Sequence, residues 1–203
     1  MVVLATIVVQ TTFVYDPITI FARQLYTIRS CKSIREVCFV NDKVRLTING
    51  AERRFTIGED MGFVSPSETL LETLRDRLGL TGAKESCNHG ACGCCTVIMD
   101  GDAVASCMVL TADCDGRSVT TIEGLRDPVT GELDPLQKAF VEETAFQCGF
   151  CTPGIIMSCR ALLNKNPHPS DEDIREALSG NYCRCISHYQ VIEAVHYYME
   201  RSA

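Results

Sequence analysis

The sequence lacks three features that would each point to a particular class of protein. It contains no run of lysine or arginine and its net charge is −7, so a surface that binds nucleic-acid phosphates is not expected. Its apolar stretch near the start, Val2 to Val9, is too short to span a bilayer, follows no basic segment and leads into no small-residue cleavage site. We therefore expect no nucleic-acid partner, no signal peptide and no membrane anchor.

Cysteine, by contrast, is abundant, with 13 in 203 residues. The odd number and the tight C-x2-C and C-x-C spacings suit metal binding better than long-range disulfides, which favours a reducing compartment. We accordingly expect the protein in the cytoplasm. Eight of the cysteines form two quartets: Cys87, Cys92, Cys95 and Cys107, then Cys148, Cys151, Cys183 and Cys185.

The first quartet has the spacing C-x4-C-x2-C with a fourth cysteine farther along the chain. Plant-type [2Fe–2S] ferredoxins use this spacing, with four thiolates sharing two irons. Gly90 and Gly93 lie inside the loop, where a chain that wraps around a cluster needs unusual backbone angles. Zinc sites favour two separate cysteine pairs, whereas three cysteines of this quartet crowd one loop. The spacing therefore predicts a [2Fe–2S] cluster.

The second quartet joins a C-x2-C pair to a distant C-x-C pair, so two tight loops must converge. Spacing alone leaves two interpretations open here, an iron–sulfur cluster and a tetrahedral all-cysteine zinc site. The sequence has no internal repeats, so the two quartets are not copies of one module.

The other cysteines are interpreted as ordinary thiols, because they have no partners at ligand spacing. Cys94 is the exception that needs comment, since it directly precedes Cys95 and an exchange of the two as ligands stays open. A spectator role for Cys94 is the favoured interpretation. The remaining thiols are Cys31, Cys38, Cys114 and Cys159.

The part of the chain from residue 44 to 123 shows strand patterns. A β-hairpin is predicted at Val44–Ile57, with Asn49-Gly50 as its turn. A second hairpin is predicted at Thr96–Ala105, and a last strand at Arg117–Ile122. Between the hairpins, a helix is predicted to begin with Ser65 as its N-cap and Glu68 at N3, as in a capping box. It ends at Gly79 and presents one face of leucines. These elements predict a small mixed sheet with one helix across it.

Strand patterns disappear after a linker predicted at Gly124–Gly131. Residues 124–203 are predicted to be all-helical, whereas residues 1–43 form an extension to which the sequence assigns no role. The predicted helices cover about Asp134–Thr144, Pro153–Asn164, Glu172–Leu178 and His188–Arg201. The third is predicted to begin with a capping box of Ser170 and Asp173.

Both quartets, taken together with their surroundings, resemble a known family. Two segments carry the resemblance: Cys-Gly-Phe-Cys-Thr-Pro-Gly at 148–154 and Gly-Asn-Tyr-Cys-Arg-Cys at 180–185. They are similar to segments of the small iron–sulfur subunit of the molybdenum hydroxylases, the xanthine dehydrogenase and carbon monoxide dehydrogenase family. The resemblance runs from about Val44 to the C-terminus.

This resemblance implies an α+β chain in which a β-grasp ferredoxin domain, 44–123, precedes a four-helix domain, 124–203. Each domain would hold one [2Fe–2S] cluster through its four cysteines. The partners implied are a large molybdopterin-binding subunit and a medium FAD-binding subunit, between which the chain would carry electrons. Gln147 would contact the pterin. No catalytic residue and no substrate site are expected on this chain itself.

Two other functions stay open at this point. One is a zinc-stabilised interaction module with a ferredoxin-like half, and the other is a free-standing two-cluster ferredoxin.

Overall fold

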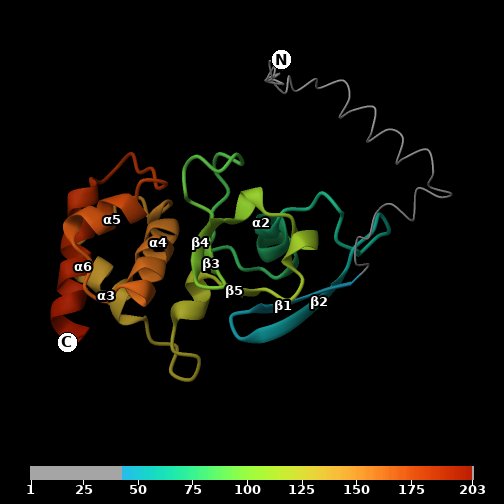
Figure 1. Ribbon diagram of the computed structural model, residues 1–203, viewed down its shortest axis with the longest axis horizontal. Helices are drawn as coiled ribbons and strands as arrows, with labels where there is room; N and C mark the ends of the chain where they lie inside the picture. Colours follow the sequence, from blue (N-terminus) through green and yellow to red (C-terminus); the bar gives the residue numbers. More distant parts are fainter. Residues whose placement is uncertain (1–42, 203) are drawn as a thin grey trace, which may run out of the picture. The chain divides into compact units, whose positions relative to one another are not determined.

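The computed structural model describes residues 43–202, in which a sheet-rich part is followed by a helical part (Figure 1). The extension predicted at residues 1–43 lies outside the described residues, apart from Lys43 at the start of the first strand. All described residues fall in one compact unit. The strands are β1 (Lys43–Ile48), β2 (Ala51–Thr56), β3 (Thr96–Met99), β4 (Asp102–Ala105) and β5 (Ser118–Thr120).

The strands form a mixed sheet in the order β2-β1-β5-β3-β4, with β1 and β5 parallel and the other neighbours antiparallel. Ile48 pairs with Ala51, so the first hairpin turns through Asn49 and Gly50, whose φ angles of 50° and 79° suit a two-residue type I′ turn. The two predicted hairpins and the mixed sheet are confirmed.

Two layers of side chains pack on opposite faces of this sheet. Val97 on β3 belongs to a core with Leu70 and Leu74 from the short helix α2 (Leu70–Glu72) and the π-helical turn η2 (Thr73–Arg77) that continues it. Its neighbour Ile98 packs with Met157 from the helical part. Successive strand residues point to opposite faces, so β3 belongs to both cores at once.

The helix across the sheet begins four residues later than the sequence predicts, which corrects the assignment of Ser65 as its cap. Thr69 is the N-cap and forms a capping box with Glu72. Ser65 instead closes a turn in which its carbonyl accepts the backbone N–H of Glu68 at 2.9 Å. The prediction was wrong because it placed Glu68 in a capping box with Ser65. The Glu68 carboxylate instead binds Arg77 and Thr73.

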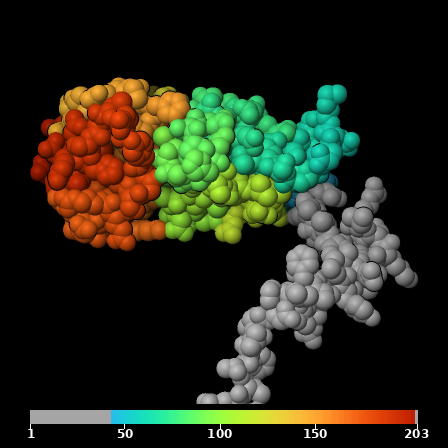
Figure 2. Space-filling view, turned by 90° about the horizontal axis from the view of Figure 1, so that it is seen from above, coloured from blue at the N-terminus to red at the C-terminus, as the bar shows by residue number. Residues whose placement is uncertain are grey.

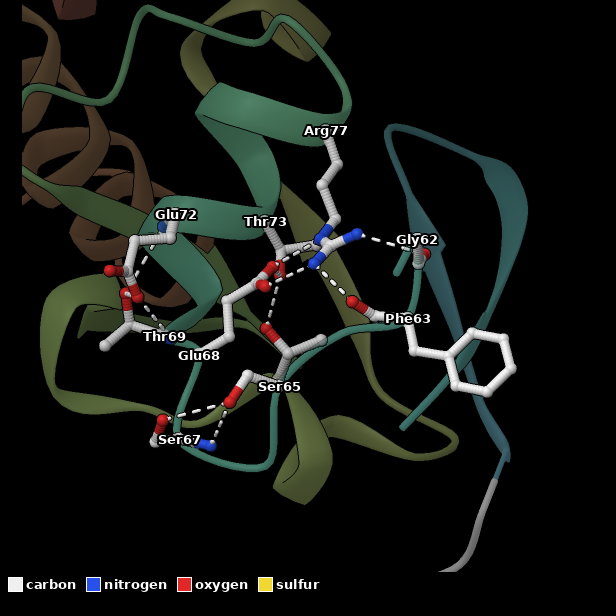
Figure 3. A network of polar contacts seen from close by, with 10 residues as sticks. Gly62, Phe63, Ser65, Ser67, Glu68, Thr69, Glu72, Thr73 and Arg77 are labelled. Carbon is white, nitrogen blue, oxygen red and sulfur yellow. Dashed lines mark hydrogen bonds and ion pairs between the residues drawn. The ribbon is translucent and has the colours of Figure 1, made fainter. Parts of the chain in front are cut away.

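Arg77 ties this helix to the preceding loop (Figure 3). Its Nε and Nη2 each donate to a Glu68 carboxylate oxygen at 2.6 Å, and Nη2 also donates to the Phe63 carbonyl at 2.6 Å. Thr73 donates its hydroxyl to the same carboxylate. A bidentate arginine–carboxylate pair with further partners is stronger than an ordinary surface ion pair, so it fixes residues 58–68 against the helix.

The helical part contains α3 (Pro135–Glu142), α4 (Thr152–Lys165), α5 (Asp171–Ala177) and α6 (His188–Ser202), each within about two residues of its predicted bounds. Asp134 and Ser170 form capping boxes at the starts of α3 and α5. The apolar faces of the four helices meet in one core, which includes Leu136, Phe140, Ile155, Ile174, Leu178, Val191 and Val195.

The predicted linker starts within a structured segment. The 3₁₀ turn η5 (Ile122–Leu125) packs Ile122 and Leu125 on both the helical core and the Ile98–Met157 cluster. In Figure 2 the orange and red surface of the helical part directly meets the green surface of the sheet-rich part. Within residues 43–202, every helix is too short or too polar to cross a lipid bilayer.

Candidate iron–sulfur sites

The first quartet lies at one edge of the sheet, with three cysteines in the loop before β3 and one after β4. Cys87 and Cys92 are half-buried, whereas Cys95 and Cys107 are buried. Cys107 sits in the 3₁₀ turn η3 (Ser106–Met108), where the Ser106 hydroxyl donates to the Cys95 carbonyl at 2.7 Å. The β3–β4 hairpin therefore brings the fourth cysteine back to the loop, as the sequence predicts.

The loop needs glycine at two positions. Gly90 and Gly93 have φ angles of 73° and 68°, in the left-handed region that side chains disfavour. A Cβ atom on Gly90 would lie 2.9 Å from Met108 Cγ, and one on Gly93 would lie 2.5 Å from the Gly180 carbonyl oxygen. The predicted unusual backbone angles are confirmed, and the lack of space gives a second reason for each glycine.

The sulfur atoms of the first quartet come together as two pairs. The Cys87 thiol interacts with that of Cys92, which also interacts with Cys94, and the Cys107 thiol interacts with that of Cys95. Hydrogen bonding with the backbone of His89 and then with the Cys92 side chain lowers the pKa of Cys87 to about 6. Burial raises the pKa of Cys107 to about 11. The loop thus already favours a thiolate at Cys87.

The second quartet is built at the ends of helices. Cys148 and Cys151 precede α4, with Cys151 in the N-cap position, and Cys183 and Cys185 lie in the loop before α6. Here too the sulfurs pair. Cys148 Sγ and Cys185 Sγ are 3.7 Å apart, and the Cys183 thiol interacts with those of Cys151 and Cys185. The two distant loops converge as the spacing requires.

The cysteines of this quartet differ in exposure, and Cys151 differs from Cys183 in charge preference. Cys148 and Cys185 are exposed, whereas Cys151 is buried, and burial raises the pKa of Cys151 to about 12. Burial also opposes the charged form of Cys183, yet the backbone N–H groups of Ile186 and Cys185, together with Cys151, lower its pKa. Those two N–H groups lie 3.4 and 3.3 Å from the sulfur. Donors aimed at sulfur are what a cluster ligand uses.

These pairs fit a two-iron cluster in the chemistry of their donor set. Among residues 43–202, no three or more histidine, cysteine or acidic side chains are arranged to hold one metal ion. In a [2Fe–2S] cluster four thiolates are divided between two irons, so ligands arriving in pairs suit it. All cysteines in the described part of the chain are free thiols, so the eight sulfurs are available as ligands.

Cys94 and Cys95 face different cores. Cys94, 5% exposed, packs with Cys151 and Ile155 in the helical core, whereas Cys95 packs with Cys107 in the sheet core. Burial raises the pKa of Cys94 to about 12. This geometry favours Cys95 as the ligand and Cys94 as a packed thiol.

The remaining predicted residues lie as follows. Cys114 and Cys159 are buried, and burial raises the pKa of each, to about 11 and about 12. Cys31 and Cys38 lie outside the described residues. Gln147 is exposed, directly before Cys148, and His89 is exposed in the first loop.

Sequence reasoning missed the contact between the two cysteine loops. The backbone N–H of Tyr182, next to Cys183, donates to the Cys92 carbonyl at 2.9 Å. Asn181 donates its amide to the Gly93 carbonyl at 3.2 Å. The conspicuous Gly-Asn-Tyr sequence before Cys183 was the available signal, but one sequence cannot show what an asparagine contacts.

Two family models match the chain, one on each side of residue 120. Residues 47–118 match a 2Fe-2S iron-sulfur cluster binding domain, and residues 121–196 match a [2Fe-2S] binding domain. Each match contains one of the cysteine quartets.

Curated proteins similar to the chain are subunits of larger enzymes. The nicotine 6-hydroxylase small subunit of Paenarthrobacter nicotinovorans is 48% identical over 155 residues, which cover 76% of this chain and 89% of that protein. The nicotinate dehydrogenase small FeS subunit of Eubacterium barkeri is 42% identical over 160 residues, covering 79% and 96%.

A solved structure agrees. A chain in the crystal structure of quinoline 2-oxidoreductase from Pseudomonas putida 86 matches with a TM-score of 0.71 and 38% identity, over 79% of this chain and 94% of that one. The paired thiols, the two matching [2Fe–2S] domains and these relatives agree with one another. The chain belongs to the family of small iron–sulfur subunits of the molybdenum hydroxylases.

Proposed function

We propose that the chain relays single electrons through two [2Fe–2S] clusters, between a molybdopterin centre on a large partner subunit and FAD on a medium partner subunit. The observation that carries this proposal is the convergence of eight free thiols into two groups of four, one in each part of the chain. The relatives are named as small or lettered subunits of hydroxylases and dehydrogenases, which supports an obligate complex. They do not favour a free-standing ferredoxin or a zinc module.

Each sulfur pair would hold one iron. In the β-grasp ferredoxin domain, 44–123, one iron would bind Cys87 and Cys92, and the other Cys95 and Cys107. In the four-helix domain, 124–203, one would bind Cys148 and Cys185, and the other Cys151 and Cys183. The bound clusters supply reversible one-electron chemistry, and the protein holds their sulfur ligands and surrounds them with hydrogen-bond donors.

The exposure of the second quartet and the family resemblance support an order of the redox centres along the path of the electrons. Cys148 and Cys185 are exposed beside Gln147 and Phe150, and Phe150 keeps 47% of its surface accessible. We infer that this surface faces the molybdenum subunit, with Gln147 against the pterin, and that the sheet-domain cluster faces the flavin. The substrate would bind on the large subunit, and the complex would work in the cytoplasm.

Isolation of the tagged chain from its native source under anaerobic conditions tests the proposal. We expect it to arrive with a molybdenum-containing chain and an FAD-containing chain, and with the visible absorption of iron–sulfide charge transfer. A colourless chain that arrives alone and holds zinc would contradict it.

A further inference from the structure

Three segments of the chain meet at a point between the two cysteine quartets, which we call the junction: Gly93, Gly154 and Asn181. Gly93 belongs to the first loop, Gly154 to the first turn of α4, and Asn181 to the loop before Cys183. A Cβ atom on Gly154 would lie 2.1 Å from the Gly93 carbonyl oxygen, and one on Gly93 would lie 2.5 Å from Asn181 Nδ2. The backbones are therefore in direct contact, with no space for another side chain.

Asn181 uses both ends of its buried amide at the junction. The residue is only 8% exposed. Its Nδ2 donates to the Gly93 carbonyl at 3.2 Å, and its Oδ1 accepts the Ser158 hydroxyl at 2.8 Å. Its backbone N–H donates to the Leu178 carbonyl at 2.8 Å. Because the amide donates on one side and accepts on the other, its orientation is fixed, and it links the first loop to α4.

The junction lies directly between residues of different quartets. Tyr182, the neighbour of Asn181, donates its backbone N–H to the Cys92 carbonyl at 2.9 Å, and Cys183 follows immediately. A cysteine of the first quartet is thus joined by one hydrogen bond to the residue before a cysteine of the second. Any movement of the Asn181 loop away from Gly93 moves the two quartets apart.

We propose that Asn181 is a positioning residue that fixes the separation of the two cysteine quartets and so sets the electronic coupling between their clusters. The inference rests on the proposed function, because it requires both clusters. Electron transfer and magnetic interaction between two paramagnetic centres both weaken steeply with distance. A polar group buried with satisfied partners resists displacement, since separating it leaves donors and acceptors unpaired.

The test replaces Asn181 with aspartate. Asn181→Asp keeps an oxygen to accept the Ser158 hydroxyl but turns a second oxygen, in place of the donor, toward the Gly93 carbonyl, which is repulsive. Asn164→Asp makes the same chemical change at an exposed position of α4 and serves as the matched control. Both variants and the wild type are prepared as full chains with both clusters and reduced with dithionite.

The measurement is low-temperature electron paramagnetic resonance. In the wild type and in Asn164→Asp, magnetic interaction should split the signals of the two reduced clusters. In Asn181→Asp both signals and the iron content should remain, while the splitting decreases or disappears. The same splitting in all three proteins, or none in a wild type that shows both signals, would overturn the inference.

If Asn181→Asp does not retain both clusters, Ser158→Ala decides the question. It removes the hydroxyl that donates to Asn181 Oδ1 and so fixes the orientation of the amide, which is then no longer held with Nδ2 toward the Gly93 carbonyl. A smaller splitting at full iron content supports the inference, and wild-type splitting overturns it. Failure of the proposed function looks different, because a wild-type chain would then lack one or both cluster signals.

Discussion

Each quartet supplies four thiols, but the first is built on a loop and a β-hairpin and the second on loops at the ends of helices. Three cysteines of the first lie within nine residues, in a loop bent by left-handed glycines and completed by a β-hairpin. Those of the second come from two loops more than thirty residues apart in the sequence, which helix packing brings together. A cluster site can therefore be encoded locally or by tertiary structure, and only the local form is evident from spacing.

The quartets also differ in which pair is accessible. In the first, Cys95 and Cys107 are buried under the sheet, and the outer pair is half-buried. In the second, Cys148 and Cys185 are fully at the surface. Solvent exposure and hydrogen bonds to sulfur both tune the potential of a cluster, so we expect the two centres to differ in potential.

The largest expected effect comes from removing one ligand. Cys95→Ser should abolish the signal of the first cluster and leave that of the second, because the second quartet lies entirely within residues 148–185. Paramagnetic resonance of the reduced protein measures both signals separately. Loss of both signals would show that the two cluster sites do not form independently of each other.

Gly154→Ala should weaken the contact between the two parts of the chain. Its new Cβ would overlap the Gly93 carbonyl oxygen, and overpacking of this kind typically costs about 1–3 kcal/mol. We expect a lower urea midpoint by far-ultraviolet circular dichroism. Gly180→Ala is the matched control, because no atom lies within 4 Å of its Cβ position and its φ is ordinary. Equal midpoints for the two variants would contradict the close packing.

Glu68→Gln should destabilise the sheet-rich part by about 1–2 kcal/mol at pH 7, since hydrogen bonds to charged groups contribute about that much. The Arg77 guanidinium, through its hydrogen bonds to the carboxylate, holds the pKa of Glu68 below its usual range, so the ionised carboxylate stabilises the fold at pH 7. Its contribution should disappear as pH falls through the lowered pKa. Urea midpoints of wild type and variant should therefore converge in acid.

A control for this ion pair is Glu52→Gln, which loses the contact with Arg54. Both side chains are more than half exposed, so a change of under about 0.5 kcal/mol is expected. A similar loss in both variants would show that the loop around Arg77 contributes no more than a surface contact.

The smallest expected effect belongs to Cys94→Ala. Because Cys94 packs in the helical core and not with Cys107, both cluster signals should keep their intensity. A marked loss of the first signal would mean that Cys94, and not Cys95, is the ligand.

The strands and helices were largely predictable from local signals. The Asn49-Gly50 turn and the capping box at Ser170 depend on neighbouring residues alone, and both are confirmed. The helix start at Ser65 was not predictable in this way. There, the Glu68 carboxylate binds Arg77, nine residues farther along the chain, in place of the backbone N–H of Ser65. A capping-box pattern covers only four residues, so it does not include Arg77.

The same distinction holds for the candidate sites. The loop from Cys87 to Cys95 was recognisable from its own spacing, whereas the second quartet became specific only through family resemblance. The roles of Gly154 and Asn181 depend on a backbone contact with Gly93, 61 and 88 residues away in the sequence. Contacts between residues so far apart produce no periodic pattern in a single sequence, so the sequence alone does not predict them.

The account stands on eight thiols holding two separate iron–sulfur clusters. Iron and acid-labile sulfide analysis of the anaerobically purified chain, combined with paramagnetic resonance after reduction, measures this directly. We predict about four iron and four sulfide per chain, two of each per cluster, and two distinguishable signals. Stoichiometric zinc without labile sulfide, in a chain that is otherwise fully folded, would contradict it.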